Sequence, residues 1–188
     1  GLKPIAVYKN SKQPVGIEWN KNWSIDRWRS YFETEKYNMG IILGDIVDVE
    51  GDNPDACDRL ERMINGVKRP KFISSKSVHN LFLNPDPNLT RVVIDGIEFR
   101  GHLHQSVVPP SFHSDGCRYR FLKDSVWTIP AMPEELKNYY FNNRIKKTTN
   151  NPSRGPKPNK RLKRGFKKTI CNVCSGNYYI HKKRLILE

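Results

Sequence analysis

The stretch Gly44-Asp45-Ile46-Val47-Asp48-Val49-Glu50 contains β-forming residues that alternate with acids. Side chains of a strand point alternately to opposite faces, so Asp48 and Glu50 lie on the same face. Two carboxylates side by side repel each other unless a cation lies between them. The strand is therefore a candidate platform for divalent metal ions, and the alternative is an exposed acidic sheet edge.

Local signals beside this strand predict its neighbours. Gly44-Asp45 lies between the apolar runs 39–43 and 46–50, which predicts a two-residue hairpin turn. Asn53-Pro54 offers an N-cap and a proline at the first helical position. The helix that follows should end at Gly66. Its apolar side is formed by Ala56, Leu60, Met63 and Ile64.

Strand and turn signals continue along the chain. Residues 71–83 predict one strand, and Asp95-Gly96 predicts a tight hairpin turn between strands over 91–94 and 97–100. The other expected elements are strands over 2–8, 102–108 and 116–121, a helix capped by Ser24 and a helix that opens at Pro133. Hairpins that alternate with a few helices indicate an α+β fold with a mostly antiparallel sheet and flanking helices.

Charge divides the chain into two parts. The protein has 188 residues and a net charge of +14, and residues 142–188 hold 14 lysines and arginines against one acid. We therefore expect one domain over 1–141 and a basic C-terminal arm over 142–188, and such arms commonly bind nucleic-acid phosphate. No membrane partner is expected, because the arm lacks an apolar face. The candidate phosphate contacts are Lys160, Arg161, Lys163, Arg164, Lys167 and Lys168.

The arm also contains a cysteine pair with metal-ligand spacing. Cys171 and Cys174 are separated by two residues, and His181 offers a third ligand. A zinc knuckle and two thiols without metal both fit this pattern, since no second cysteine pair follows. The cysteine usage favours a reducing compartment over a disulfide framework.

A third acid on a strand extends the candidate metal platform. Glu98 faces the same way as Arg100 in the strand over 97–100. If this strand neighbours the strand of Asp48 and Glu50, three carboxylates converge. Such a set of hard oxygen ligands suits Mg²⁺ or Mn²⁺. Two such ions would suit phosphoryl or nucleotidyl transfer.

A second polar group fits a triphosphate. Ser77 and His79 are two residues apart and share one strand face, and Lys76 is adjacent. Hydrogen-bond donors and cations of this kind bind phosphate oxygens. A lone strand histidine is more often structural, but the nearby acids favour a functional role.

Taken in order, these motifs resemble the bifunctional primase–polymerase (prim-pol) N-terminal domains of the archaeo-eukaryotic primase superfamily, of the phage and plasmid type. The resemblance covers roughly residues 4–140. Its motifs are Ser11-Lys12-Gln13-Pro14, Asn38-Met39-Gly40-Ile41 with Gly44, Asp48-Val49-Glu50, Ser77-Val78-His79, Glu98 and the Pro109-Pro110-Ser111 segment that continues to Tyr119. Glu50 stands where the family more often has aspartate.

The resemblance implies an RRM-like catalytic core and a DNA-directed DNA and RNA polymerase. By position, it implies that Asp48, Glu50 and Glu98 are catalytic and hold two Mg²⁺ or Mn²⁺ ions. It also implies that His79, with Ser77 and Lys76, binds the nucleotide phosphates and that Arg100 assists.

The implied partners are a DNA template and primer, dNTP or NTP, and a replicative helicase on a separate polypeptide. The implied location is the cytoplasm, that of the host cell if a phage or plasmid encodes the protein.

Two other functions compete with this interpretation. His102-Leu103-His104 fits the metal motif of a His-hydrophobe-His replication-initiator nuclease, with Tyr139 or Tyr140 as the nucleophile. That hypothesis leaves the acid pair and His79 unexplained. The other alternative is a non-catalytic nucleic-acid-binding module that depends on the basic arm.

Overall fold

The computed structural model describes residues 2–9, 11–21, 23–34 and 36–144, together with the backbone of three later strands. These strands are β10 (Phe166–Ile170), β11 (Asn177–His181) and β12 (Arg184–Leu187), which form an antiparallel sheet in the order β10-β11-β12. Among the described helices, none has the length and apolar character needed to cross a membrane.

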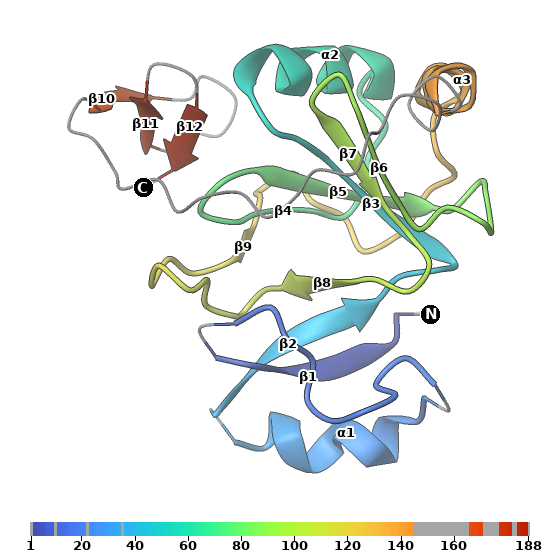
Figure 1. Ribbon diagram of the computed structural model, residues 1–188, viewed down its shortest axis with the longest axis vertical. Coiled ribbons are helices and arrows are strands. Elements are labelled where there is room, and N and C mark those ends of the chain that lie inside the picture. Colours follow the sequence, from blue (N-terminus) through green and yellow to red (C-terminus); the bar gives the residue numbers. More distant parts are fainter. Residues whose placement is uncertain are drawn as a thin grey trace, which may run out of the picture.

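A six-stranded antiparallel sheet forms the centre of the fold, with the order β6-β7-β3-β5-β4-β9 (Figure 1). Its strands are β3 (Ile46–Gly51), β4 (Lys71–Ile73), β5 (Val78–Leu83), β6 (Arg91–Ile94), β7 (Ile97–Arg100) and β9 (Arg120–Phe121). Strand β3 lies between β7 and β5 and is buried along its whole length. This position places the acid pair in the interior of the molecule.

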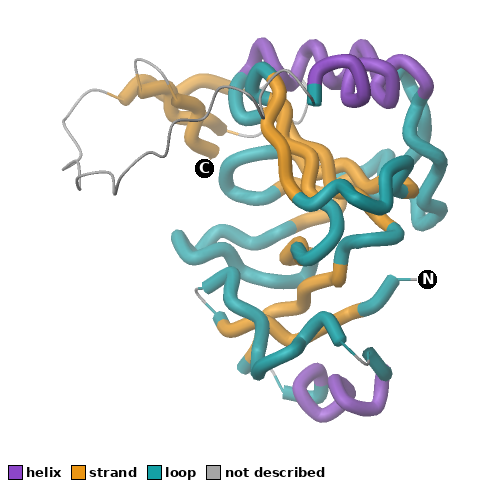
Figure 2. The backbone as a smooth tube through the Cα atoms, turned by 45° about the vertical axis from the view of Figure 1, so that its right-hand side comes forward, coloured by secondary structure: helices purple, strands orange, loops and turns teal. Residues whose placement is uncertain are grey.

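A smaller antiparallel sheet has the order β1-β2-β8, from β1 (Pro4–Tyr8), β2 (Tyr37–Ile42) and β8 (Gln105–Val108). Helix α1 (Ile25–Phe32) packs on β1 and β2. Helices α2 (Pro54–Ile64) and α3 (Glu134–Asn143) lie beyond the large sheet, at the opposite end from α1 (Figures 1 and 2). Strand β8 is the edge strand of the small sheet on the side toward the large sheet (Figure 1).

Two apolar cores lie on opposite sides of the six-stranded sheet. On one side, Val47, Val49 and Phe99 pack with residues of α2 and α3. On the other side, Leu81 and Phe72 pack with residues of the small sheet and α1. Because side chains alternate along β3, its valines fill the helix-side core, and its acids face the region between the sheets.

Several local signals are confirmed. The Asn53 side chain accepts from Ala56 N and caps α2, whose predicted apolar residues are all buried. The Ser24 side chain caps α1 in the same way. Asp95 and Gly96 have φ of 47° and 86°, the two positive values that a type I′ turn requires, and they connect β6 to β7. The α+β class with antiparallel sheets is also as predicted.

The hairpin predicted at Gly44-Asp45 is wrong. Strand β2 pairs with β1 and β8, whereas β3 pairs with β5 and β7. The two residues therefore carry the chain from one sheet to the other. Gly44 has φ of 150°, which an L-residue rarely adopts, and its amide donates to Ile46 O at 3.0 Å.

The single strand predicted over 71–83 is also wrong, because the chain folds back on itself. Strands β4 and β5 pair with each other across a turn over 74–77. The turn is held by Ser74, whose hydroxyl accepts from the amides of Lys76 and Ser77 at 3.1 and 3.2 Å. Two further strands are shorter than predicted: β8 starts at Gln105, and β9 holds only Arg120 and Phe121.

Candidate functional site

The structure brings the three predicted acids together on one face of the large sheet. Glu98 on β7 lies opposite Glu50 on β3, and His79 on β5 lies opposite Glu50 from the other side. Asp48 is fully buried, and Glu50 and Glu98 are each 8% exposed. The strand of Glu98 is thus a neighbour of the strand of Asp48 and Glu50, which was the condition for the carboxylates to converge.

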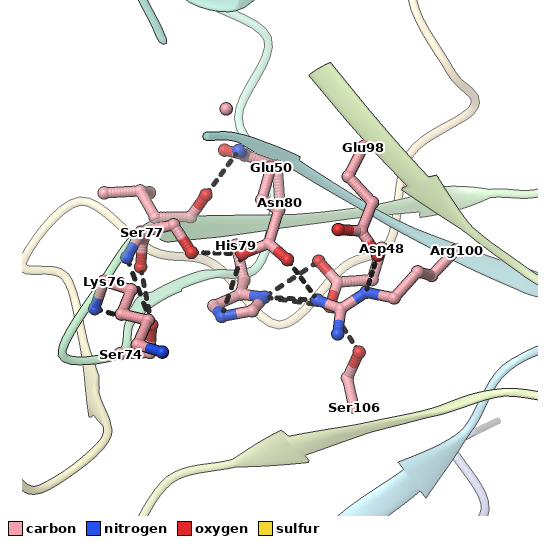
Figure 3. A network of polar contacts seen from close by, with 12 residues as sticks. Asp48, Glu50, Ser74, Lys76, Ser77, His79, Asn80, Glu98, Arg100 and Ser106 are labelled. Carbon is pink, nitrogen blue, oxygen red and sulfur yellow. Dashed lines mark hydrogen bonds and ion pairs between the residues drawn. The ribbon is translucent and has the colours of Figure 1, made fainter. Parts of the chain in front are cut away.

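The guanidinium of Arg100 lies where the three carboxylates meet (Figure 3). Its Nη2 is 2.9 Å from Asp48 Oδ2 and 2.8 Å from Glu50 Oε1. Its Nε is 3.5 Å from Glu98 Oε1. One buried cation therefore offsets part of the charge of three buried acids, which would otherwise be costly to desolvate.

His79 is the next neighbour of this cluster. Its Nδ1 lies 2.9 Å from Asp48 Oδ2 and 3.1 Å from Arg100 Nη2. The ring stacks on Phe72, with centroids 4.7 Å apart and an interplanar angle of 9°. His79 Nε2 is buried and has no hydrogen-bond partner among the described residues, although it lies 3.5 Å from Glu50 Oε2.

Two hydroxyls complete the contacts of the acids. Ser77, which precedes β5, donates to Glu50, and Ser106 on β8 donates to Asp48. The small sheet thus supplies one hydrogen bond to the acids of the large sheet. Ser106 was not predicted as a site residue, because its contact depends on how the two sheets pack and has no local sequence signal.

Asp48 and Glu50 have lowered pKa values despite their burial. Burial alone would raise the pKa of Asp48, but His79 and Arg100 together with hydrogen bonds from His79 and Ser106 hold it well below its ordinary value. Glu50 has a lowered pKa for the same reasons, although the charge of Asp48 opposes the shift. Burial would lower the pKa of Arg100, and the three carboxylates raise it above its ordinary value.

A cleft of about 420 Å³ opens beside Glu50, Glu98 and Arg100. Two further cations line it: Lys12, and Arg91, whose Nε is 2.8 Å from Glu98 Oε1. Burial and the nearby charge of Arg100 lower the pKa of Lys12. Neither residue was predicted as a site residue. The signal for Lys12 was its place in the Ser11–Pro14 motif, and the signal for Arg91 was its register opposite Arg100.

The predicted phosphate-binding residues are arranged around the turn over 74–77. Ser77 and His79 both contact the acid cluster, as expected from their shared face. Lys76 is exposed at the tip of the turn, and its side chain lies away from the acids (Figure 3). On the far side of the turn, the hydroxyl of Ser75 lies 2.9 Å from His113 Nδ1.

The carboxylates supply the oxygen ligands that Mg²⁺ and Mn²⁺ prefer. In the described part of the chain, however, no group of three or more histidines, cysteines, aspartates or glutamates is arranged to hold a metal ion. At the acid cluster, Arg100 lies among the carboxylates. The donor set therefore fits divalent ions in its chemistry, and metal binding there requires the guanidinium to move.

The histidines of the nuclease hypothesis do not lie on a strand. Residues 101–104 form a turn in which Leu103 has φ of 64°, and His104 Nδ1 lies 3.1 Å from His102 O. The shared strand face that the motif needs is therefore absent.

The tyrosines of that hypothesis already use their hydroxyls within the fold. Tyr140 is buried and donates to Asp86 at 2.8 Å, and burial raises its pKa to about 12. Tyr139 donates to Asp95 at 3.2 Å. Neither hydroxyl is set up as a nucleophile.

Part of the predicted site lies outside the described residues. This part comprises Cys171, Cys174, Lys160, Arg161, Lys163 and Arg164. His181 lies on β11, and Lys167 and Lys168 lie on β10, of which the structure describes only the backbone.

Comparison with known proteins gives one family match. Residues 1–136 match the family described as the N-terminal domain of bifunctional DNA primase/polymerase (Prim-Pol). The match contains every residue of the acid cluster and of the turn over 74–77. A search of curated proteins finds no match to the chain.

Proposed function

The chain belongs to the family of bifunctional DNA primase/polymerase N-terminal domains, and we propose that it is a template-dependent nucleotidyltransferase that synthesises and extends primers. The observation that carries this proposal is the convergence of Asp48, Glu50 and Glu98 on one cation, beside His79. Three buried carboxylates at one point can bind divalent cations, and nucleotidyl transfer needs such cations beside the phosphates. A module that only binds nucleic acid has no need of them.

Asp48, Glu50 and Glu98 would hold two Mg²⁺ or Mn²⁺ ions. When bound, such ions would lower the pKa of the primer 3′-hydroxyl and neutralise the triphosphate and the leaving pyrophosphate. In the reaction, the 3′-oxygen forms a bond to the α-phosphorus, the bond from that phosphorus to the β-phosphate oxygen breaks, and the hydroxyl proton passes to water. As metal ligands, Asp48 and Glu50 would act in their ionised form, which their lowered pKa values favour.

Arg100 has two successive partners in this proposal. Without metal, its guanidinium compensates the charge of the three acids. With divalent ions at the acids, the guanidinium would be free to turn toward the adjoining cleft, where the phosphates of a nucleotide could accept its hydrogen bonds. Lys12 lines this cleft, and His79 and Ser77 contact the acids beside it. These residues, with Lys76 at the tip of the adjoining turn, would bind the remaining phosphate oxygens.

The proposal extends to features that the described residues do not carry. It includes an RRM-like arrangement of the core, a phage or plasmid role in replication, and partners consisting of template, primer, dNTP or NTP and a separate helicase. It also includes template binding by the basic arm and zinc at Cys171, Cys174 and His181. Each of these features rests on the sequence pattern.

Primer extension tests the proposal. The full chain is incubated with a labelled primer–template, dNTPs and Mg²⁺ or Mn²⁺, and compared with Asp48→Asn and Glu98→Gln. Both variants keep the side-chain size and remove one charge. We expect extension to fall at least about a hundredfold in each, and DNA affinity measured separately to stay close to wild type.

The matched control is Asp45→Asn, which removes an exposed acid whose ion pair is with Lys3. It should extend primers at the wild-type rate. Normal synthesis by both cluster variants would reject these residues as the catalytic acids. Absence of synthesis by the wild type, with DNA binding intact, would favour the non-catalytic alternative.

A further inference from the structure

A second cavity lies on the small sheet, apart from the acid cluster. Its volume is about 380 Å³, and its lining includes Lys9, Tyr37, Asn38, Phe112 and Arg118. Lys9 follows β1, Tyr37 and Asn38 begin β2, and Phe112 and Arg118 belong to the loop after β8. This size is in the range of small-ligand sites. None of the residues assigned to the nucleotidyltransferase reaction lines it.

The ring of Phe112 is presented at this cavity together with two cations. Phe112 is 41% exposed. Lys9 Nζ and Arg118 Cζ lie over its ring, 6.0 and 5.6 Å from the centroid. No acid is among the described residues that line the cavity. The site therefore combines an aromatic face with uncompensated positive charge.

The position of Phe112 is fixed by buried hydrogen bonds. The amide of the buried Asn38 side chain donates to Phe112 O at 2.6 Å, and Phe112 N donates to Asn38 Oδ1 at 3.0 Å. Next to it, Ser111 Oγ accepts from Met39 N at 2.7 Å and donates to Met39 O at 3.1 Å. Both peptide groups are thus held against β2. The backbone that carries the ring is therefore ordered before any ligand binds, which lowers the entropy cost of binding.

A second aromatic side chain that lines the cavity, Tyr37, packs against other aromatic rings. Tyr37 packs edge-on against Tyr31, with centroids 5.1 Å apart, and tilted against Tyr8 at 6.0 Å. An isolated antiparallel bridge pairs the backbones of Phe112 and Arg118, so that the two side chains come from neighbouring positions. Proteins that bind single-stranded nucleic acid combine the same two features, namely aromatic side chains for the bases and cations for the backbone.

We propose that this cavity binds one base of a single-stranded nucleic acid, stacked on Phe112, with Lys9 and Arg118 contacting the flanking phosphates. Because both cations lie over the ring, the stacked base would take the place of a cation that then turns to the adjoining phosphate. An apolar peptide would have to desolvate two cations without compensation, so the charge favours a nucleic acid.

This inference deepens the proposed function, because the bound strand would be the template. His113, the residue after Phe112, contacts Ser75 in the turn that also carries Lys76 and Ser77. A single loop thus connects the stacking site with the proposed nucleotide phosphates.

The test is fluorescence anisotropy of the full chain with a labelled single-stranded oligonucleotide, without metal or nucleotide. We compare wild type with Phe112→Leu, which keeps an apolar side chain but lacks a ring, and with Phe112→Trp, which keeps a ring. Loss of stacking on one base should weaken binding of the leucine variant about fivefold to a hundredfold. The tryptophan variant should bind at least as tightly as wild type.

An oligonucleotide of abasic sugar-phosphate units separates stacking from charge. On this strand, wild type and Phe112→Leu should have equal affinity. Lys9→Ala and Arg118→Ala should each lower the slope of log affinity against log salt by the equivalent of about one phosphate contact, on either strand. Lys68→Ala, on the exposed connection after α2, should leave the slope unchanged. Equal affinities of wild type and Phe112→Leu for the normal strand would overturn the proposal, as would an equal loss on both strands.

The same assay distinguishes this inference from the proposed function. Asp48→Asn should bind the oligonucleotide as wild type does, because its carboxylate lies outside the cavity. If the chain proves unable to extend primers but shows the base-dependent effect of Phe112, the stacking site stands and the polymerase proposal fails. If extension is normal and the Phe112 effect is absent, the polymerase proposal stands and the stacking site fails.

Discussion

Glu50 on β3 lies directly opposite Glu98 on β7, and the guanidinium of Arg100 contacts both carboxylates, at 2.8 and 3.5 Å. Like charges at opposed positions destabilise an antiparallel pair. In this position their repulsion is offset by an arginine that comes from the same strand as Glu98. The centre of the sheet is therefore stable only while a cation is present, and a guanidinium or divalent ions can both meet that need.

Replacing Arg100 should make folding depend on metal. Arg100→Met leaves the buried carboxylates of Asp48 and Glu50 without their arginine, although Arg91 still contacts Glu98. Removal of one partner of a buried ion pair costs about 3–5 kcal/mol. Mn²⁺ should then raise the melting temperature of this variant more than that of wild type, because the ions supply the missing positive charge. Thermal unfolding with EDTA and with Mn²⁺ measures both effects.

The control for this variant is Arg91→Met. Arg91 contacts only Glu98 of the three acids, and its side chain is 56% exposed, so its loss should cost about 1 kcal/mol or less. Arg100→Lys keeps the charge and serves if the methionine variant does not fold. Equal melting temperatures and equal responses to Mn²⁺ in wild type and Arg100→Met would contradict the expected role of Arg100.

Acidification should destabilise the metal-free protein through the buried acids. Asp48 and Glu50 have lowered pKa values in the folded state, against about 3.9 and 4.3 in an unfolded chain. A lowered pKa adds stability above the unfolded value, and this stability is lost as pH falls toward the folded value. The free energy of unfolding should therefore fall below about pH 4, by up to about 1.4 kcal/mol per pH unit for each proton bound.

Urea unfolding between pH 6 and pH 2 in EDTA measures this dependence. The Asp48→Asn variant should be less stable than wild type at pH 6, and the difference should shrink as the pH falls. Asp45→Asn, which changes an exposed carboxylate, should follow the wild-type curve. A difference between wild type and Asp48→Asn that stays constant over the whole range would reject a depressed Asp48 pKa as its source.

Two glycines with positive φ allow steric conflict to be separated from backbone strain. Gly96 has φ of 86°, and a Cβ there would lie 2.6 Å from Asn53 Nδ2, the residue that caps α2. Gly66 has φ of 73°, and a Cβ there would meet nothing within 4 Å. Gly66→Ala should cost about 1 kcal/mol of strain, and Gly96→Ala should cost about 1–3 kcal/mol more, because the cap must shift. Equal losses in chemical denaturation would show that the Asn53 contact is not limiting.

Local signals were sufficient where one short segment determines its own conformation. Asn53-Pro54 predicted the start of α2, because an N-cap and a first-turn proline act within four residues. Asp95-Gly96 predicted the β6–β7 turn, because both residues tolerate positive φ. Alternation along β3 predicted that Asp48 and Glu50 share a face.

Sequence reasoning failed where the partner of a strand is set by the whole fold. Gly44-Asp45 has the composition of a hairpin turn, but the strands on either side belong to different sheets. Turn-forming residues predict that the chain changes direction, but they do not predict which strands pair on either side of the turn. The places of Ser106 and Lys12 at the site were missed for the same reason, since they come from the packing of the small sheet against the large one.

The role of Arg100 shows a further limit. Its spacing from Glu98 predicted a shared face and a place near the nucleotide, but it did not predict contact with all three acids. That contact follows from register, because Arg100 lies opposite Asp48 when Glu98 lies opposite Glu50. Once the pairing of β3 with β7 is known, the position of the cation follows.

Removal of the basic arm should weaken DNA binding and reduce its salt dependence. The deletion should begin after Arg144, because Arg144 forms an ion pair with Asp86 and lies over the rings of Tyr140 and Phe141 at the end of α3. Residues 145–188 hold 13 lysines and arginines against one acid. For every phosphate that the shortened chain no longer neutralises, the slope of log affinity against log salt should fall by about 0.7 on a single strand.

A variant of full length separates charge from other properties of the arm. Its six central cations are changed to glutamine at Lys160, Arg161, Lys163, Arg164, Lys167 and Lys168. If all six contact phosphate, the slope should fall by about four, and the deletion should lower it at least as much. Titrations of one oligonucleotide at salt concentrations from about 50 to about 300 mM give the slopes. A deletion that weakens binding while the glutamine variant keeps the wild-type slope would show that these six charges are not the source of the arm's affinity.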